Sequence, residues 1–217
     1  MPCPPSYRAR CLAPLALASM VILSSCALGA RPTLGKPGGA TSTVGASTGN
    51  AELDALLAKV DAVGDKQFTA KYLLTRLLGP VTKDATVVQS PPITAIIVGD
   101  TKFTRGPEDR TCTISNGQCE SGILEQRMGD LSMSTNFYAA APAAQMRVSY
   151  RRRASDPTFK QRQLTLGNVD CVVIPLGPGE EEYCVAGNGL IAYVARADVQ
   201  IELKDLSDVA DPTLMAG

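Results

Sequence analysis

YCVAGNGLIAYVARADVQIELK, residues 183–204, is the stretch from which the rest of the fold can be worked out. Two apolar runs, Tyr183 to Ala186 and Leu190 to Ala195, flank the sequence Gly-Asn-Gly, which is a strong signal for a β-hairpin turn. A last strand follows in which Val199, Ile201 and Leu203 alternate with Gln200, Glu202 and Lys204. The stretch therefore predicts a closing antiparallel meander whose last strand has one apolar and one polar face.

The same period of two runs through the chain upstream of the meander. From Gln67, apolar side chains alternate with Thr69, Lys71 and Thr75, which predicts a strand. Pro91-Pro92 precedes the apolar run Ile93–Val98, and prolines are tolerated at the start of a strand because no central hydrogen bond is lost there. Further strands are predicted at 85–89, 101–105, 111–114, 120–124, 161–166 and 169–175.

Two segments have helical character instead. Asn50 is a favourable N-cap, and the acidic residues Glu52 and Asp54 fall in the first turn, where the helix dipole favours them. Apolar residues recur at helical spacing from Leu53 to Val63, and Gly64 ends the run. Within residues 126–160, where the strand rhythm breaks, 143–151 is predicted as a second helix.

Two predicted strands, 93–98 and 190–195, are apolar on both faces, unlike a strand of an antiparallel sheet with one wet face. Either both faces are covered by a packed core, or one face lines a hydrophobic pocket. The second alternative predicts an apolar ligand cavity of a few hundred Å³. Its expected lining residues are Phe68, Tyr72, Ile97, Val172 and Leu203.

The N-terminus has the layout of an export signal. Arg8 and Arg10 precede the apolar run Leu12–Leu23, and Ser24-Ser25-Cys26 follows it. A membrane-spanning helix would need a longer uninterrupted run, and an ordinary signal peptide is the other alternative. The segment resembles a bacterial lipoprotein signal with its lipobox, which implies cleavage before Cys26 and acylation of that cysteine. A multiply acylated cysteine would attach the protein stably to the extracytoplasmic face of the membrane.

The chain then divides into a signal peptide (1–25), a lipidated tether (26–50) and a folded domain (51–217). The tether is built almost entirely of Ala, Gly, Ser, Thr and Pro, a composition that cannot form a packed core. The chain holds 21 Lys and Arg and 21 Asp and Glu, and loses two arginines with the signal, so its near-neutral charge predicts no nucleic-acid partner.

Catalysis and cofactors are not expected. The sequence contains no histidine, which removes the most frequent general base and metal ligand. No spacing singles out a catalytic group or a metal site, and a monomeric binding protein is predicted.

Seven cysteines are present, and three of them fall in the signal or carry the lipid. The remaining four are Cys112, Cys119, Cys171 and Cys184, an even number that predicts disulfides in an exported chain. Sequence allows three pairings, and proximity favours Cys112–Cys119 and Cys171–Cys184. A four-cysteine zinc site is the alternative, but the usual CxxC spacing is missing.

Two charged clusters have competing interpretations. The basic residues Arg147, Arg151, Arg152, Arg153, Lys160 and Arg162 could contact anionic lipid headgroups or form a solvated helix end. The run Glu180-Glu181-Glu182 is predicted to be an exposed, solubilising hairpin loop, with a calcium or partner contact as the alternative.

The order of one helix, a run of strands, a helical interruption and a closing meander resembles the lipoprotein-carrier superfamily typified by LolA, with LppX- and LprG-type lipoproteins as lipid-anchored relatives. The resemblance rests on element order, the Pro91-Pro92 strand start and the final hairpin and strand. It implies an α+β fold in which a curved antiparallel sheet forms a half-barrel and helices plug its concave face. The function it implies is the binding or carriage of a lipid or other amphiphile; an envelope sensor or protein-binding module on the same fold is the alternative.

Overall fold

The computed structural model describes residues 45–79, 81–130 and 140–215, all of which belong to one compact unit within residues 39–217. Four helices are described: α1 (Ala51–Asp61), α2 (Glu125–Asp130), α3 (Ala140–Arg151) and α4 (Pro212–Met215). The strands are β1 (Phe68–Arg76), β2 (Val81–Ser90), β3 (Ile93–Val98), β4 (Thr101–Arg105), β5 (Arg110–Thr113), β6 (Gln118–Ser121), β7 (Thr158–Leu164), β8 (Gly167–Leu176), β9 (Gly179–Val185), β10 (Ile191–Ala195) and β11 (Val199–Ser207).

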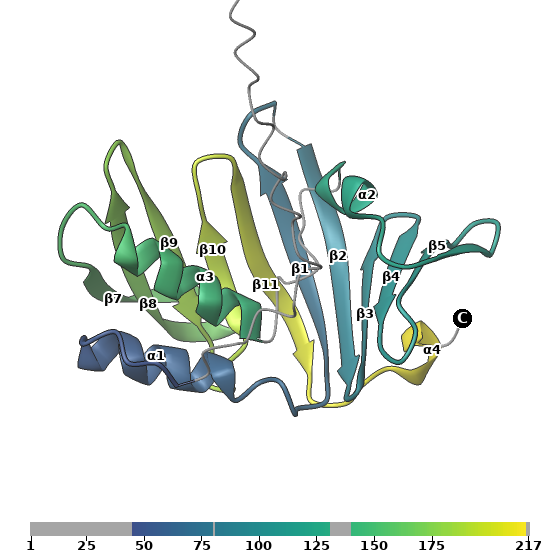
Figure 1. Ribbon diagram of the computed structural model, residues 1–217, viewed down its shortest axis with the longest axis horizontal. Coiled ribbons are helices and arrows are strands. Elements are labelled where there is room, and N and C mark those ends of the chain that lie inside the picture. The colour runs from purple at the N-terminus through teal and green to yellow at the C-terminus, as the bar shows by residue number, and fades with distance from the viewer. Residues whose placement is uncertain (1–44, 80, 131–139, 216–217) are drawn as a thin grey trace, which may run out of the picture. The chain divides into compact units, whose positions relative to one another are not determined.

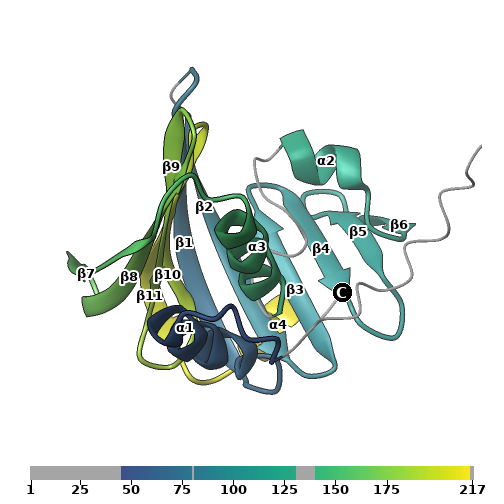
Figure 2. The same ribbon diagram turned by 60° about the vertical axis from the view of Figure 1, so that its left-hand side comes forward.

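The strands form one open sheet of 11 strands in the order β6-β5-β4-β3-β2-β1-β11-β10-β9-β8-β7. Every neighbouring pair is antiparallel. The sheet curves, and α1 and α3 lie against its inner side (Figures 1 and 2). The predicted fold class, an α+β half-barrel with helices on the concave face, is therefore confirmed.

The first and last strands meet in the middle of the sheet. Tyr72 of β1 pairs with Leu203 of β11, and the register of this strand pair shifts between Lys71 and Tyr72. The two halves of the sheet are each a meander of consecutive hairpins, so this one long-range pairing joins them. It fuses the closing meander predicted from sequence to the N-terminal strands.

Helix α1 forms as its sequence predicts. The Asn50 side chain accepts a hydrogen bond from the Leu53 amide at 2.9 Å, which caps the helix, and the apolar stripe from Leu53 to Val60 is buried. The loop after α1 is held by the buried amide of Gln89 on β2, which donates to the backbone carbonyls of Val63, Gly64 and Lys66. The helix is thereby fixed on the sheet by both an apolar face and a polar clamp.

The β9–β10 turn packs closely on α1. Gly189 has a φ of +92°, and a Cβ at this position would lie 2.1 Å from the carbonyl oxygen of Lys59. Only glycine meets both the backbone geometry and the close approach. The predicted Gly-Asn-Gly turn is confirmed, and it also serves as a contact between the meander and the helix.

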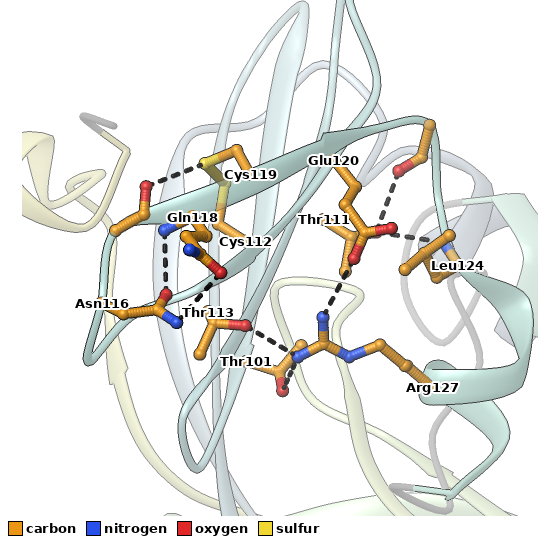
Figure 3. Close-up of polar contacts among 12 residues, drawn as sticks. Thr101, Thr111, Cys112, Thr113, Asn116, Gln118, Cys119, Glu120, Leu124 and Arg127 are labelled. Carbon is orange, nitrogen blue, oxygen red and sulfur yellow. Dashed lines mark hydrogen bonds and ion pairs between the residues drawn. A yellow bond between two sulfur atoms is a disulfide. The ribbon is translucent and has the colours of Figure 1, made fainter.

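Both favoured disulfides form. Cys112–Cys119 joins β5 to β6, and Cys171–Cys184 joins β8 to β9. Around the first bridge, Thr111 accepts a hydrogen bond from the Leu124 amide, and Arg127 of α2 donates to Thr101 and Thr113 (Figure 3). These contacts hold the edge hairpin and α2 together.

The differences from the sequence prediction lie mostly in this hairpin and at strand ends. A strand was expected at 120–124, but β6 is Gln118–Ser121, and Glu125 begins helix α2. The disulfide sets the register, because it places Cys112 directly opposite Cys119. Strand β2 begins at Val81, four residues before the predicted start, because pairing with β1 extends into residues without an alternating pattern.

Candidate functional site

Four of the five residues predicted to line an apolar cavity belong to one core cluster of the described residues. Phe68, Tyr72, Val172 and Leu203 are each at most 2% exposed and belong to the continuous core that also contains the apolar stripes of α1 and α3. Burial raises the pKa of Tyr72, so its hydroxyl is protonated at neutral pH. Ile97 is only half-buried and lies outside that core cluster.

A cavity of about 230 Å³ lies where the β7–β8 and β9–β10 turns approach the end of β11. Most of its lining is aliphatic, with two asparagine side chains and one glycine in addition. The lining residues are Leu164, Leu166, Asn168, Val169, Ala186, Gly187, Asn188, Ala192, Leu203 and Leu206. We call this cavity the rim pocket; Leu203 is the one residue it shares with the predicted set.

The floor of the rim pocket is buried and its mouth is open. Val169, Ala192 and Leu203 are at most 6% exposed, whereas Leu166 in the β7–β8 turn is 47% exposed. An engineered apolar cavity of about 150 Å³ binds benzene, so the rim pocket is large enough for a short stretch of alkyl chain. It is smaller than the roughly 300–1,000 Å³ of sites that enclose a whole drug-sized ligand.

Polar groups gather at one side of this pocket. The Asn188 side chain accepts a hydrogen bond from the Leu190 amide at 3.2 Å, which orients its amide group. The ammonium of Lys66, an exposed residue, donates to the Asn188 carbonyl oxygen at 2.7 Å. A cation therefore sits beside an apolar pocket, an arrangement that suits an amphiphile with an anionic head.

The prediction of an exposed loop at Glu180-Glu181-Glu182 is wrong. All three residues belong to β9, and the side chains of Glu181 and Glu182 are only 16% and 9% exposed. Glu181 accepts hydrogen bonds from Ser149 of α3 and from Tyr183. Strand pairing with β8 overrides the loop-like composition because it places alternate side chains on the inner and outer faces.

The Glu181 network holds α3 on the sheet. Arg196 donates to the Tyr183 hydroxyl at 3.2 Å and lies 3.8 Å from Glu181. Burial raises the pKa of Tyr183 to about 12, and its hydrogen bond to Glu181 acts in the same direction. Tyr183 is therefore a hydrogen-bond donor at neutral pH, and with Ser149 it donates to the same oxygen, Oε2, of Glu181.

Glu182 lies on the other face of β9. Lys160 and Arg162 of β7 bind its carboxylate at 3.1 and 3.0 Å. Cys171 and Cys184 are close enough to Glu182 to form a potential ligand set. Their sulfurs are bonded to each other, however, so this cluster offers no thiolates for a metal.

The predicted basic cluster is dispersed in the structure. Arg147 is buried in an ion pair with Asp61, Lys160 and Arg162 bind Glu182, and Arg153 stacks on the Tyr150 ring. Arg151 and Arg152 are exposed. These six residues therefore form neither a single basic face for lipid headgroups nor a uniformly solvated helix end.

The predicted lipid attachment site, Cys26, lies outside the described residues, as do the predicted signal peptide and most of the predicted tether. The last residues of the tether contact the folded unit. Asp54 accepts hydrogen bonds from the Ser47 hydroxyl at 2.6 Å and from the Thr48 amide at 2.8 Å, and the first of these contributes most to lowering the Asp54 pKa. Among the described residues, no helix is long and apolar enough to cross a membrane.

Sequence reasoning missed most of the rim pocket. Its residues come from two turns and from four strands, β7, β8, β10 and β11, and apolar side chains in turns have no period that would mark them. Leu166 was placed at the end of the predicted strand 161–166, but β7 ends at Leu164 and Leu166 belongs to the turn before β8.

No protein-family model and no curated protein sequence matches the chain. Among solved structures, MucB is similar, with a TM-score of 0.48 and 13% identity over 79% of this chain, which spans 64% of the MucB chain. LprF from Mycobacterium bovis matches with a TM-score of 0.41 and 13% identity over 77% of this chain and 97% of LprF. A LolA superfamily protein from Nitrosomonas europaea matches with a TM-score of 0.36 and 9% identity, over 76% of this chain and 97% of the other. The similar structures thus include a member of the LolA superfamily, which the sequence also resembles. These similarities concern the fold alone.

Proposed function

We propose that this protein is an extracytoplasmic binding protein, attached to the membrane through a lipid on Cys26, that holds the alkyl part of an amphiphile in the rim pocket. The observation that carries the proposal is the pocket itself, an aliphatic space of about 230 Å³ with an open mouth. Each methylene removed from water contributes about 0.8 kcal/mol. A chain segment of four or five carbons would therefore contribute about 3–4 kcal/mol.

The polar side of the pocket supports an anionic or strongly polar head group. Lys66 reaches the Asn188 carbonyl oxygen, so its ammonium lies within a few ångströms of the pocket lining. A carboxylate or phosphate held there would form a charge-assisted hydrogen bond. Fatty acids and phospholipid fragments are amphiphiles of this class.

Two observations support the location outside the cytoplasm. The chain forms two disulfides, which persist in oxidising compartments. The N-terminal residues have the lipobox layout, ending in Ser25-Cys26.

The test is binding of a fluorescent fatty acid to the purified full chain, followed through probe emission. Ala186→Phe puts a ring into the half-buried pocket wall and should weaken binding about tenfold, equivalent to about 1.4 kcal/mol. Ala154→Phe, in an exposed segment outside the lining, is the matched control and should bind like the wild type. Equal affinities for all three proteins would exclude the rim pocket as the site. No binding by the wild type would refute the proposed function.

A protein-binding role is the second candidate, and the open edges of the sheet favour it. Strands β6 and β7 are the two ends of the sheet order, and every residue of β6 is exposed. An edge strand offers unpaired backbone groups to which an extended peptide can add. Lys160 and Arg162 on β7 act against such pairing because charged edge residues discourage it. Retention of a partner by the Ala186→Phe variant would favour this candidate over lipid binding.

A further inference from the structure

The β1–β2 hairpin ends in an exposed apolar tip. Leu77, Leu78 and Val81 are 41%, 71% and 44% exposed, and together they make up half of the six large apolar side chains that are exposed in the described part of the chain. All three flank one turn, and the hairpin projects beyond the neighbouring strands (Figures 1 and 2). We call Leu77, Leu78 and Val81 the apolar tip.

The fold does not require these side chains to be apolar. The backbone of the turn is held by the Leu77 amide, which donates to the Asp198 carbonyl oxygen at 2.8 Å, and by Gly79, whose φ is +72°. Polar residues would satisfy the same turn and would avoid exposing leucines to water. Contiguous exposed apolar groups usually mark an interaction surface.

Basic residues stand directly behind the apolar tip. Arg76, which is exposed, is the last residue of β1 and pairs with Val81, and Lys83 follows two residues later on β2. The acidic Asp84 lies one position further from the tip, opposite Leu73. Along the hairpin itself, apolar groups thus come first, then cations, then a carboxylate; the exposed Asp198 of the β10–β11 turn adds one more carboxylate beside Leu77.

This order is complementary to an anionic bilayer surface. Apolar side chains of interfacial segments enter about 5–10 Å into the boundary between head groups and acyl chains. Cations just behind them then lie at the level of the phosphates, where each contributes about 1 kcal/mol of attraction, a factor of about five. We propose that the apolar tip docks onto the anionic membrane surface as a second contact of the protein, independent of the rim pocket and of the N-terminal attachment.

The absence of tryptophan from the chain makes the tip easy to probe. In Leu78→Trp, the single indole should emit at shorter wavelength when the full chain is mixed with phosphatidylglycerol vesicles, and brominated acyl chains should quench it. Val209→Trp is the matched control. The exposed fraction of Val209, 67%, is similar to the 71% of Leu78, but Val209 lies beside Thr69, at the opposite end of β1 from the tip. Its emission should not respond to the vesicles.

Two further variants, made in a Leu77→Trp background, test the two kinds of group. Leu78→Ser should lower the ratio of docked to undocked tip about tenfold, and Arg76→Gln should lower it about fivefold on phosphatidylglycerol but not on neutral phosphatidylcholine. Both positions are exposed, so circular dichroism should show an unchanged fold.

An unchanged emission of Leu78→Trp in the presence of vesicles would overturn the proposal. So would a shift of equal size in both Leu78→Trp and Val209→Trp, which would mean adsorption without a preferred face. A shift that appears without lipid and grows with protein concentration would assign the tip to a protein contact instead, and would also overturn it.

Discussion

Replacing Asp61 by alanine should destabilise the protein strongly, because it leaves a buried guanidinium without its counter-ion. Arg147 of α3 binds the Asp61 carboxylate through two nitrogens, at 2.7 and 3.4 Å, and the two side chains are only 8% and 9% exposed. The Ala46 carbonyl oxygen, 3.4 Å away, is a poor substitute for a carboxylate. This ion pair joins the end of α1 to the middle of α3.

The magnitude follows from the burial. Removal of one partner of a buried ion pair costs about 3–5 kcal/mol, because the other charge is left desolvated. Asp61 is the last residue of α1, where a carboxylate is unfavourable next to the helix carbonyls, and this offsets part of the loss. We therefore expect about 3 kcal/mol, which at a urea m-value of about 2 kcal/mol/M lowers the unfolding midpoint by about 1.5 M.

Urea unfolding followed by circular dichroism measures this shift. The matched control is Asp170→Ala, which removes the partner of Lys59, another α1 residue, from a pair that is 41% and 48% exposed. Exposed pairs contribute about 0–1 kcal/mol, so its midpoint should move by at most about 0.5 M. The double variant Asp61→Leu with Arg147→Met should recover most of the stability, because no charge is then left buried. If Asp61→Ala costs no more than Asp170→Ala, the reasoning from burial is refuted.

Three further perturbations have defined outcomes. Gly189→Ala should lower the melting temperature by about 4–8 °C, corresponding to a clash and backbone strain of about 2 kcal/mol; an unchanged melting curve would contradict the close contact with α1. Ser47→Ala should raise the pKa of Asp54 toward its ordinary value, as measured by an NMR titration of the carboxylate. Because the pKa of Asp54 is lower in the folded than in the unfolded protein, the stabilisation by Asp54 is present above the unfolded-state pKa and is lost as the pH falls through the folded-state pKa. If Asp54 titrates at the same pH in the variant as in the wild type, Ser47 is excluded as the cause. Under mild reduction, the disulfide of the exposed Cys119 should open before the buried bridge between β8 and β9, as alkylation and mass spectrometry would show; the opposite order would contradict the burial of that second bridge.

Much of the fold could be predicted because its signals are local. Alternation with a period of two locates β1 and β11, since neighbouring side chains of a strand point to opposite faces, and β3 is marked by its apolar run after Pro91-Pro92. The cap at Asn50 and the turn before Leu190 depend on side chains within a few residues of each other. Disulfide pairing was predictable for the same reason, because each bridge closes a hairpin.

The candidate site was much less accessible from the sequence. Phe68 and Tyr72 were predicted to line a cavity. An apolar side chain on the inner face of a sheet can contact either a ligand or neighbouring side chains, and the sequence does not distinguish the two. The packing of α1 and α3 against the sheet decides between them. The same holds for the rim pocket, whose walls come from turns far apart in sequence. Its single predicted residue, Leu203, is there because β11 passes beneath both turns.

The sequence by itself therefore determined α1 and α3, most of the strands and the favoured cysteine pairs, whereas the export signal and its lipid site stay predictions. Tertiary structure alone decided that β1 lies beside β11, that Arg147 meets Asp61, and that Glu181 and Glu182 lie on opposite faces of one strand. Secondary structure follows from interactions between residues a few positions apart. The choice of partner across the sheet depends on the free energy of the whole packed unit, which no short stretch of sequence contains.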